Sequence, residues 1–294
     1  MQATALCLTG RECIKEVEAL TASPLAVGQE AEVLSFLAQR PIHTVVMAGF
    51  IRDNGLESPL NRGTFYACRG SAGRLVGVAL IGHITMVETE SEAAIESFAR
   101  VAQSYGQAHA ILGEREKVSR FWSHYSSAGQ PMRLACRELL LEQRWPVEVH
   151  EPIALRRATP DDLEQIVPAH AQMAFEESGV NPLEKDPEGF RRRCARRVER
   201  GRTWVCAEDG KVVFKADVVS ETPEAVYVEG IWVNPEARGK GVGLRAMSQL
   251  ARTLLRQAAS VCILVNERNE RALSLYRRSG LKLRGHYDTI YLRQ

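Results

Sequence analysis

Several features that would identify common protein classes are missing from this sequence of 294 residues. Its 38 lysines and arginines nearly balance 36 aspartates and glutamates, which leaves a formal net charge of +2. Nucleic-acid-binding chains usually carry a basic excess, so we expect no nucleic-acid partner. No apolar run approaches the ~20 residues of a membrane-spanning helix. Residues 1–10 also lack the charged start and apolar core of a secretory signal, and we expect no membrane association.

Metal-binding and disulfide patterns are missing as well. The seven cysteines are dispersed, odd in number and never arranged as Cys-x-x-Cys, which argues against a disulfide framework or a zinc site. The seven histidines show no ligand spacing, so we assign no residue to a metal. A composition with 45% hydrophobic and 25% charged residues predicts a packed core, and the length suits two domains. We expect a reduced, cytoplasmic protein.

What the sequence does contain is a glycine-rich loop at residues 233–243, which read Val-Asn-Pro-Glu-Ala-Arg-Gly-Lys-Gly-Val-Gly. It lies between a strand-like run at 226–233 and a helix-like run at 244–257. Glycines let backbone N–H groups approach a ligand, and a helix N-terminus favours an anion. The dinucleotide motif fails because Leu244 replaces its third glycine, and the nucleoside-triphosphate motif fails because Asn234 replaces its first. The remaining pattern, Arg-x-x-Gly-x-Gly, indicates a phosphate site or simply a tight turn.

A second segment follows a strand-like run at residues 260–265. Asn269 is suited to cap a helix, because its side chain can accept an orphan backbone N–H. Tyr276 lies seven residues later, so two helical turns place both on one face. Gly280 can end the helix in a left-handed conformation. The segment therefore reads Asn-x-x-Ala-x-x-x-Tyr followed by Gly-Leu.

Together these two segments resemble the cofactor-binding segments of the Gcn5-related N-acetyltransferase (GNAT) family, in the same order and with a strand between them. The resemblance spans roughly residues 153–292. It begins with a helix opened at Thr159 and includes a hairpin predicted around Asp209-Gly210. It implies the α/β acyl-CoA N-acyltransferase fold, a mixed sheet with helices on both faces. In that fold acetyl-CoA lies where two parallel strands splay apart.

The N-terminal half repeats this order of elements without the two motifs. We predict a helix at 30–39, a hairpin over 65–85, a helix at 91–105 capped by Ser91, a strand at 108–112 and a helix at 114–125, listed in chain order. Residues 41–47 fit either a strand or the start of a helix. We therefore predict two tandem GNAT-like domains. Residues 1–148 form a degenerate domain that lacks the cofactor loop, and residues 149–294 form the acetyl-CoA-binding catalytic domain.

The resemblance assigns cofactor contacts residue by residue. The loop amides and the Arg238 side chain would hold the pyrophosphate, the backbone near Trp232 would pair with the pantetheine arm, and Asn269 would touch that arm. Val233 would supply the N–H that polarises the thioester carbonyl. The full set of predicted cofactor-binding residues is Trp232, Val233, Arg238, Gly239, Lys240, Gly241, Val242, Gly243, Asn269 and Tyr276.

Two residues are predicted to be catalytic. Tyr276, by resemblance, would protonate the departing coenzyme A thiolate; otherwise it is a buried aromatic on an amphipathic helix. Glu229 is the first candidate for the base that deprotonates the amine, because a carboxylate within so apolar a strand needs a role or a partner. Alternation places it with Tyr227 and Ile231. A structural salt bridge is the alternative, and residues 176–177, both glutamates, are weaker candidates.

The predicted function is N-acetyl transfer from acetyl-CoA to a primary amine of a small molecule or a protein, by direct attack. The alternative is an acetyl-CoA-binding regulatory module with little catalysis. Five arginines within residues 191–197 predict either a solvated helix surface or a contact to an acidic acceptor or the cofactor's 3′-phosphate. Cys194, Cys206 and Cys262 are interpreted as packing residues. The acceptor and the oligomeric state stay open.

Overall fold

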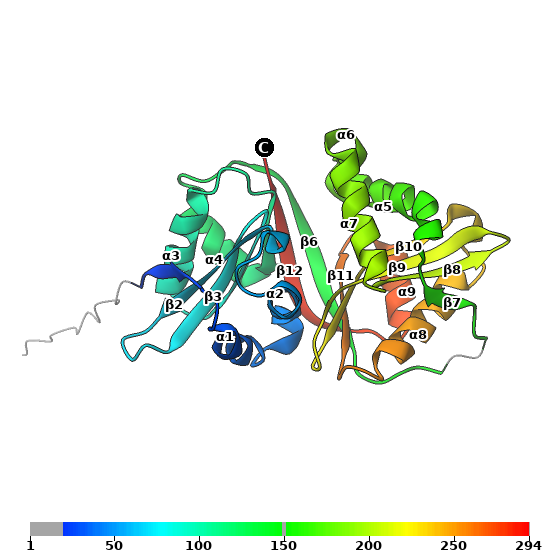
Figure 1. Ribbon diagram of the computed structural model, residues 1–294, viewed down its shortest axis with the longest axis horizontal. Coiled ribbons are helices and arrows are strands. Elements are labelled where there is room, and N and C mark those ends of the chain that lie inside the picture. The colour runs from blue at the N-terminus through cyan, green and yellow to red at the C-terminus, as the bar shows by residue number, and fades with distance from the viewer. Residues whose placement is uncertain (1–19, 149–150, 294) are drawn as a thin grey trace, which may run out of the picture.

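A computed structural model describes residues 20–148 and 151–293, and these residues form one continuous mixed sheet with helices on both faces (Figure 1). The sheet has 12 strands in the order β1-β2-β3-β4-β5-β12-β6-β11-β10-β9-β8-β7. The predictions made for residues 1–10 lie outside the described residues. Within the described ranges, no helix has the length and apolar character needed to cross a membrane.

The N-terminal half contributes eleven of the elements. They are β1 (Ala22–Pro24), α1 (Glu30–Leu37), α2 (Pro41–Asn54), η1 (Pro59–Asn61), β2 (Gly63–Arg69), β3 (Leu75–Gly82), β4 (Ile84–Thr89), α3 (Glu92–Gln103), β5 (Ala110–Glu114), α4 (Arg115–Tyr125) and β6 (Met132–Gln143). Segment 41–47, for which the sequence left strand and helix open, begins helix α2.

The C-terminal half runs in a closely similar order. Its elements are β7 (Leu155–Arg157), η2 (Pro160–Asp162), α5 (Leu163–Ser178), α6 (Pro182–Lys185), α7 (Pro187–Glu199), β8 (Thr203–Glu208), β9 (Lys211–Glu221), β10 (Val226–Val233), η3 (Pro235–Ala237), α8 (Val242–Leu254), β11 (Val261–Asn266), α9 (Glu270–Arg278) and β12 (Lys282–Leu292). Each half thus contributes six strands and flanking helices, as expected for two tandem GNAT-like domains.

Local sequence signals produce several of these boundaries. The Ser91 side chain accepts the Ala94 N–H and caps α3. Thr159 and Asp162 form a reciprocal capping box that opens the segment leading into α5. At the hairpin between β8 and β9, Asp209 and Gly210 both adopt positive φ, as the predicted turn requires.

The two halves exchange their last strands, which lie side by side at the centre of the molecule (Figure 1). Strand β6 of the N-terminal half pairs antiparallel with β11 of the C-terminal half. Strand β12 of the C-terminal half pairs antiparallel with β5 of the N-terminal half. The two long strands also pair with each other, and this joins the halves into one sheet. The domain boundary predicted after residue 148 therefore assigns β6 to the N-terminal half, although β6 pairs with two strands of the C-terminal half, β11 and β12.

The helices divide between the two faces of the sheet. On one face, α3 and α4 cover the N-terminal half and α8 and α9 cover the C-terminal half. On the other face, α1 and α2 cover the N-terminal half, while α5 and α7 cover the C-terminal half. Helix α2 also reaches the centre of the sheet, where Val45 packs with Tyr227 of β10 and Leu140 of β6. Tyr227 and Leu140 therefore mark the α2 and α5 face.

Candidate functional site

Strands β10 and β11 pair only at their beginning and then separate. The parallel pairing consists of Val226 with Val261 and Tyr227 with Cys262. Strand β10 nevertheless continues to Val233, where it stays paired with β9 on its other side. The edge of β10 that faces β11 is consequently without a strand partner over most of its length. This is the splayed pair of parallel strands that the sequence resemblance implies.

A bulge in β10 turns the strand just beyond this opening. Its register with β9 shifts between Glu229 and Trp232, and Gly230 adopts φ +60°. The predicted alternation fails here: Ile231 does not share the Tyr227 face but packs with the core under α8 and α9. The extra residue of the bulge inverts the orientation of the side chains that follow, so Trp232 packs toward the α5 and α7 face instead.

A buried ionic cluster holds the bulge in place. The Lys215 ammonium, 1% exposed, donates to the Gly230 carbonyl at 3.1 Å and pairs with Asp217. Arg197 donates to the same carboxylate at 3.1 Å, and His170 lies 3.0 Å from the Lys215 nitrogen. Burial opposes the charge of Asp217, but Lys215 and its other partners hold the pKa of that carboxyl well below its usual range. A side chain at Gly230 would collide with this cluster, since a Cβ there would lie 2.9 Å from both Lys215 and Asp217.

The glycine-rich loop presents a set of free backbone N–H groups. In the described part of the chain, no acceptor receives a hydrogen bond from the N–H groups of residues 239–244. Gly241 is the N-cap of α8 and brings no capping side chain, and the first turn of α8 carries no acid. Gly239 and Gly241 adopt φ +78° and +79°, conformations that other residues rarely take. Free amides at an uncapped helix N-terminus form an anion-binding cradle.

The other predicted loop residues surround this cradle. Arg238, Gly239, Lys240 and Gly241 are exposed, whereas Val242 is buried. The Arg238 Nε donates to the Val233 carbonyl at 3.1 Å and ties the loop to the end of β10. Gly243 serves packing, because a Cβ at this position would lie 3.0 Å from the Val233 side chain. The third glycine thus lets α8 approach β10 closely.

Helix α9 places Asn269 and Tyr276 as its sequence pattern predicts. Asn269 caps the helix by accepting the Ala272 N–H at 3.0 Å. Tyr276 is 6% exposed and packs in the core beneath α8 and α9. Its hydroxyl group makes no hydrogen bond within the described residues. Burial raises the pKa of this phenol above its ordinary value, so it holds its proton at neutral pH.

Three carboxylates gather on the opposite face of the opening. Glu229, with a side chain 37% exposed, pairs with Arg197 at 3.3 Å. Glu177 of α5 is an exposed residue whose carboxylate accepts the Tyr291 hydroxyl at 3.2 Å. Glu138 of β6 is the third member, and the charge of Glu177 acts on it. Glu176 is exposed as well, but its carboxylate is bonded to Gln172 on its own helix and is not part of this set.

The arginine run of α7 divides between surface and interior. Arg191, Arg192 and Arg193 form ion pairs with neighbouring acids near the surface. Arg197 instead bridges Asp217 and Glu229. No contact of this run in the described residues favours either of the two ligands predicted for it, an acidic acceptor or the 3′-phosphate of the cofactor.

Comparison with known proteins agrees with this geometry. The family model described as "Acetyltransferase (GNAT) family" matches residues 168–281, which include the opening, the loop and α9. The match places a GNAT domain at residues 168–281, within the C-terminal half. A search of curated proteins finds no match to the chain.

Solved structures extend the likeness to both halves. A Drosophila protein is 14% identical with a TM-score of 0.65, over 93% of this chain and 99% of its own. A tandem GNAT protein from the clavulanic acid biosynthesis pathway is 15% identical with a TM-score of 0.57, over 94% and 99%. A GCN5-related N-acetyltransferase from Sphaerobacter thermophilus is 14% identical with a TM-score of 0.55, over 94% and 97%. At these identities the likeness establishes the fold, a tandem GNAT arrangement.

The sequence analysis assigned no role to Lys215, Asp217, His170 or Glu138. A signal for the first two exists, since two charged residues at alternate positions interrupt an otherwise apolar strand. Alternation places Lys215 and Asp217 on one face, where charges need partners if they are buried. Glu138 gives a weaker signal, because its place depends on which strands β6 joins.

Proposed function

We propose that this protein transfers the acetyl group of acetyl-CoA to a primary amine of a small molecule or a protein, by direct attack of the amine. The observation that carries the proposal is the set of uncommitted N–H groups at residues 239–244, placed beside the opening between β10 and β11. A pyrophosphate suits this cradle, and an extended pantetheine arm suits the unpaired edge of β10. The GNAT domain supplies acyl transfer as the general class of reaction.

The residues of this chain fit the cofactor as follows. The amides of residues 239–243 would hold the pyrophosphate, and Arg238 and Lys240 would add positive charge at the exposed rim. The backbone of Trp232 and Val233 would pair with the pantetheine arm, and Asn269 would contact the same arm from α9. When bound, acetyl-CoA supplies the thioester whose acetyl group is transferred.

Two groups of the chain act on that thioester. The N–H of Val233 would donate to the carbonyl oxygen and would stabilise the negative charge that develops there. Tyr276 would donate its proton to the departing thiolate. Its buried phenol suits this role, because the raised pKa keeps it protonated at neutral pH.

The acceptor amine approaches from the face that carries the carboxylates. A lysine-like amine has a pKa near 10.4, so it arrives as an ammonium ion and must lose a proton before it attacks. Glu229, the base that the sequence predicts, lies just before the bulge and attracts this ammonium group. Removing the proton directly would break its ion pair with Arg197. We place the reaction in the cytoplasm, with no nucleic acid or membrane involved.

Release of free thiol from acetyl-CoA tests this function. The acceptors are alkylamines, polyamines, amino sugars and lysine-containing peptides, each with mass detection of the acetylated product. We expect thiol release that depends on at least one amine. Tight coenzyme A binding without transfer to any of these amines would instead support the alternative, a binding module with little catalysis.

A further inference from the structure

Strand exchange brings a carboxylate of the N-terminal half to the acceptor side of the C-terminal site. Glu138 of β6 is in register with Asn266, the last residue of β11, and with Tyr287 of β12. It therefore lies four positions along β11 from Cys262, the last residue that pairs with β10. Alternation along β6 places Glu138 on the same face as Leu140, which packs with Tyr227.

Glu138 is buried without a cationic partner. It is 8% exposed, and within the described residues it receives a hydrogen bond only from the Thr289 hydroxyl, with no lysine or arginine at ion-pair distance. Burial raises its pKa to about 7, and the negative charges of Glu177 and Asp288 act in the same direction. Thr289 opposes this rise by donating to the carboxylate.

Glu142, four residues along the same strand, shows the contrast. Its side chain is fully buried, yet it pairs with Arg144 at 2.9 Å and Arg284 at 2.6 Å. These two guanidinium groups outweigh burial and hold the pKa of Glu142 below its ordinary value. One buried glutamate of β6, Glu142, thus has two cationic partners, whereas Glu138 has none among the described residues.

The groups around Glu138 form a polar, unpaired set. Tyr227 of β10 is 9% exposed, and its hydroxyl has no partner in the described part of the chain. Burial raises the pKa of Tyr227, and the charges of Glu229, Glu138 and Glu177 act in the same direction. The titratable and charged groups that face or influence Glu138 are Cys136, Glu177, Tyr227, Asp288 and Tyr291.

We propose that Glu138 is the residue that takes the proton from the acceptor amine, with Thr289 as the residue that positions its carboxylate. The inference rests on the proposed acetyl transfer. One N–H bond of the ammonium ion breaks, and the proton passes to a Glu138 oxygen, directly or through water. The neutral amine then forms the new C–N bond as the C–S bond breaks, and the thiolate receives its proton from Tyr276. The second proton that the amide nitrogen must lose returns to the Tyr276 oxygen through water, and Glu138 releases its proton to solvent. Glu229 keeps its ion pair with Arg197 throughout.

The chemistry favours this division of roles. A base works best when its pKa lies near the working pH, because it is then largely ionised and still holds a proton well. Glu138 meets that condition at neutral pH. The N-terminal half, which lacks the cofactor loop, thereby contributes a reacting group to the site of its neighbour.

The first measurement needs no acceptor. Infrared difference titration of the full-length protein follows protonated carboxyl groups between pH 5 and 9. We expect one carboxyl that titrates near pH 7 in the wild type and in Glu142→Gln and that disappears in Glu138→Gln. Thr289→Val should move this titration to higher pH, because it removes the hydrogen bond that lowers the pKa of Glu138. An unchanged titration in Glu138→Gln would overturn the proposal.

The second measurement uses thiol release with n-propylamine, spermidine and a lysine peptide as acceptors. Wild-type kcat/KM should rise with pH through about 7, because Glu138 must be ionised to act. Glu138→Gln, whose amide oxygen can still accept from Thr289, should lose this limb and lower kcat at least tenfold at pH 8 with coenzyme A affinity unchanged. Thr289→Val should shift the limb upward.

The outcomes separate the two hypotheses. Full turnover and an unchanged pH limb in Glu138→Gln would overturn the role of Glu138 while leaving acetyl transfer intact. If the wild type titrates near pH 7 but acetylates none of these acceptors, the proposed transfer fails and the catalytic role of Glu138 fails with it.

Discussion

The two halves of this protein have the same opening in their sheets but fill it differently. In the N-terminal half, β4 and β5 pair in parallel only at Ile84 with Ala110 and at Thr85 with Ile111. In the C-terminal half, β10 and β11 also form only two such pairs. The backbone frame of a cofactor site is therefore present twice. What differs is the set of side chains beyond the last pair.

Ion pairs bridge the opening of the N-terminal half. Lys117 of α4 binds Glu88 of β4 at 2.8 Å, and both side chains are 8% exposed. Arg40 joins Glu88 at 3.0 Å to Glu114, at the end of β5, at 2.7 Å. Glu90 approaches Lys117 at 3.0 Å. These side chains link β4 to β5 and α4 across the space where a pantetheine arm would have to pass.

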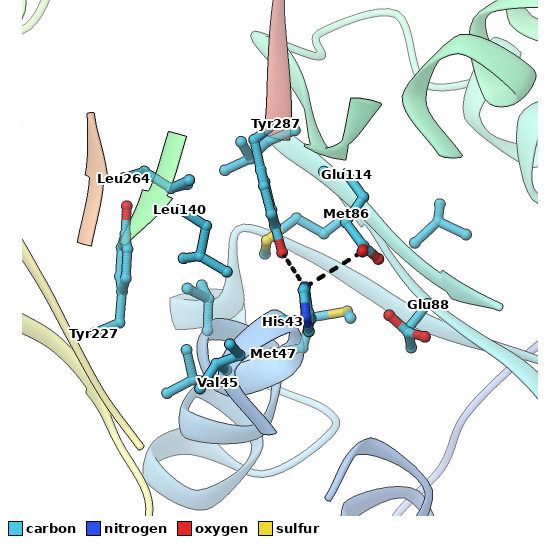
Figure 2. A pocket seen from close by; sticks show the side chains of 15 residues that line it. His43, Val45, Met47, Met86, Glu88, Glu114, Leu140, Tyr227, Leu264 and Tyr287 are labelled. Carbon is cyan, nitrogen blue, oxygen red and sulfur yellow. Dashed lines mark hydrogen bonds and ion pairs between the residues drawn. The ribbon is translucent and has the colours of Figure 1, made fainter. Parts of the chain in front are cut away.

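A small hollow lies beside this network. A cavity of about 40 Å³ lies under α2, lined by side chains from both halves, with room for only a few waters (Figure 2). Figure 2 shows His43 directed at Tyr287 and Glu114, at 2.9 and 3.4 Å. In the C-terminal half, the charged cluster of Lys215 and Asp217 instead lies against the bulge.

The helices that follow the two openings, α3 and α8, differ in the capping and charge of their N-termini. At α3, Ser91 caps the amides with its own side chain, and Glu92 adds negative charge in the first turn. At α8, no side chain caps the amides and no acid occupies the first turn. An anion is therefore repelled by one helix N-terminus and attracted by the other. The free amides at the start of α8 therefore distinguish the proposed phosphate site from its counterpart in the N-terminal half.

The largest effect is expected from the cluster behind the bulge. Replacing Asp217 with Ala leaves Lys215 buried beside Arg197 without a carboxylate, and we expect a loss of about 3–5 kcal/mol in the free energy of unfolding. Urea denaturation measures it. As a control, Glu188→Ala removes an exposed ion pair with Arg192 and should cost less than about 1 kcal/mol. Equal losses in the two variants would contradict the structural role of the cluster.

The contrast between the two helix N-termini predicts the second-largest effect, which is on coenzyme A affinity. Gly241→Asp places a carboxylate and an unfavourable positive φ at the cradle. Calorimetry should show coenzyme A binding weakened at least ~100-fold, an energy of about 3 kcal/mol. If binding is retained, the loop does not hold the pyrophosphate.

A smaller effect is expected at Tyr276. Tyr276→Phe keeps the aromatic ring in the core but removes the proton donor, so thiol release should slow at least tenfold while coenzyme A affinity stays within about twofold. Steady-state kinetics and calorimetry on the same preparation separate the two. Unchanged turnover would remove Tyr276 from the mechanism.

The smallest effect belongs to the N-terminal half. Ser91→Ala removes a helix cap and should reduce the free energy of unfolding by about 1 kcal/mol. Coenzyme A affinity should not change, since we propose that the cofactor binds only in the C-terminal half. A second, weak coenzyme A site appearing in the variant would show that the cap alone prevents binding there.

Local chemistry made much of this structure predictable from sequence. The caps at Ser91, Thr159 and Asn269 and the turn at Asp209-Gly210 each depend on residues within a few positions of one another. The loop at 238–243 carries its own glycines and charges. Such signals need no knowledge of distant parts of the chain.

Long-range features were not predictable in the same way. Helix α2 packs on the N-terminal sheet and also contacts the centre of the sheet, so its sequence lacks a clear one-sided period. The bulge at Gly230 reversed the predicted position of Ile231, because one extra residue inverts the alternation. The place of Glu138 depends on β6 pairing with a strand more than a hundred residues later.

The exchanged strands determine the order in which the two halves can complete folding during synthesis. Strand β5 has its sheet edge covered only by β12, residues 282–292. During synthesis the edge of β5 therefore stays unpaired until residues 282–292 have left the ribosome. Exposed edges of this kind invite wrong pairing between nascent chains. A polypeptide that stops after residue 148 should accordingly aggregate, and supplying residues 151–293 as a separate chain should rescue it.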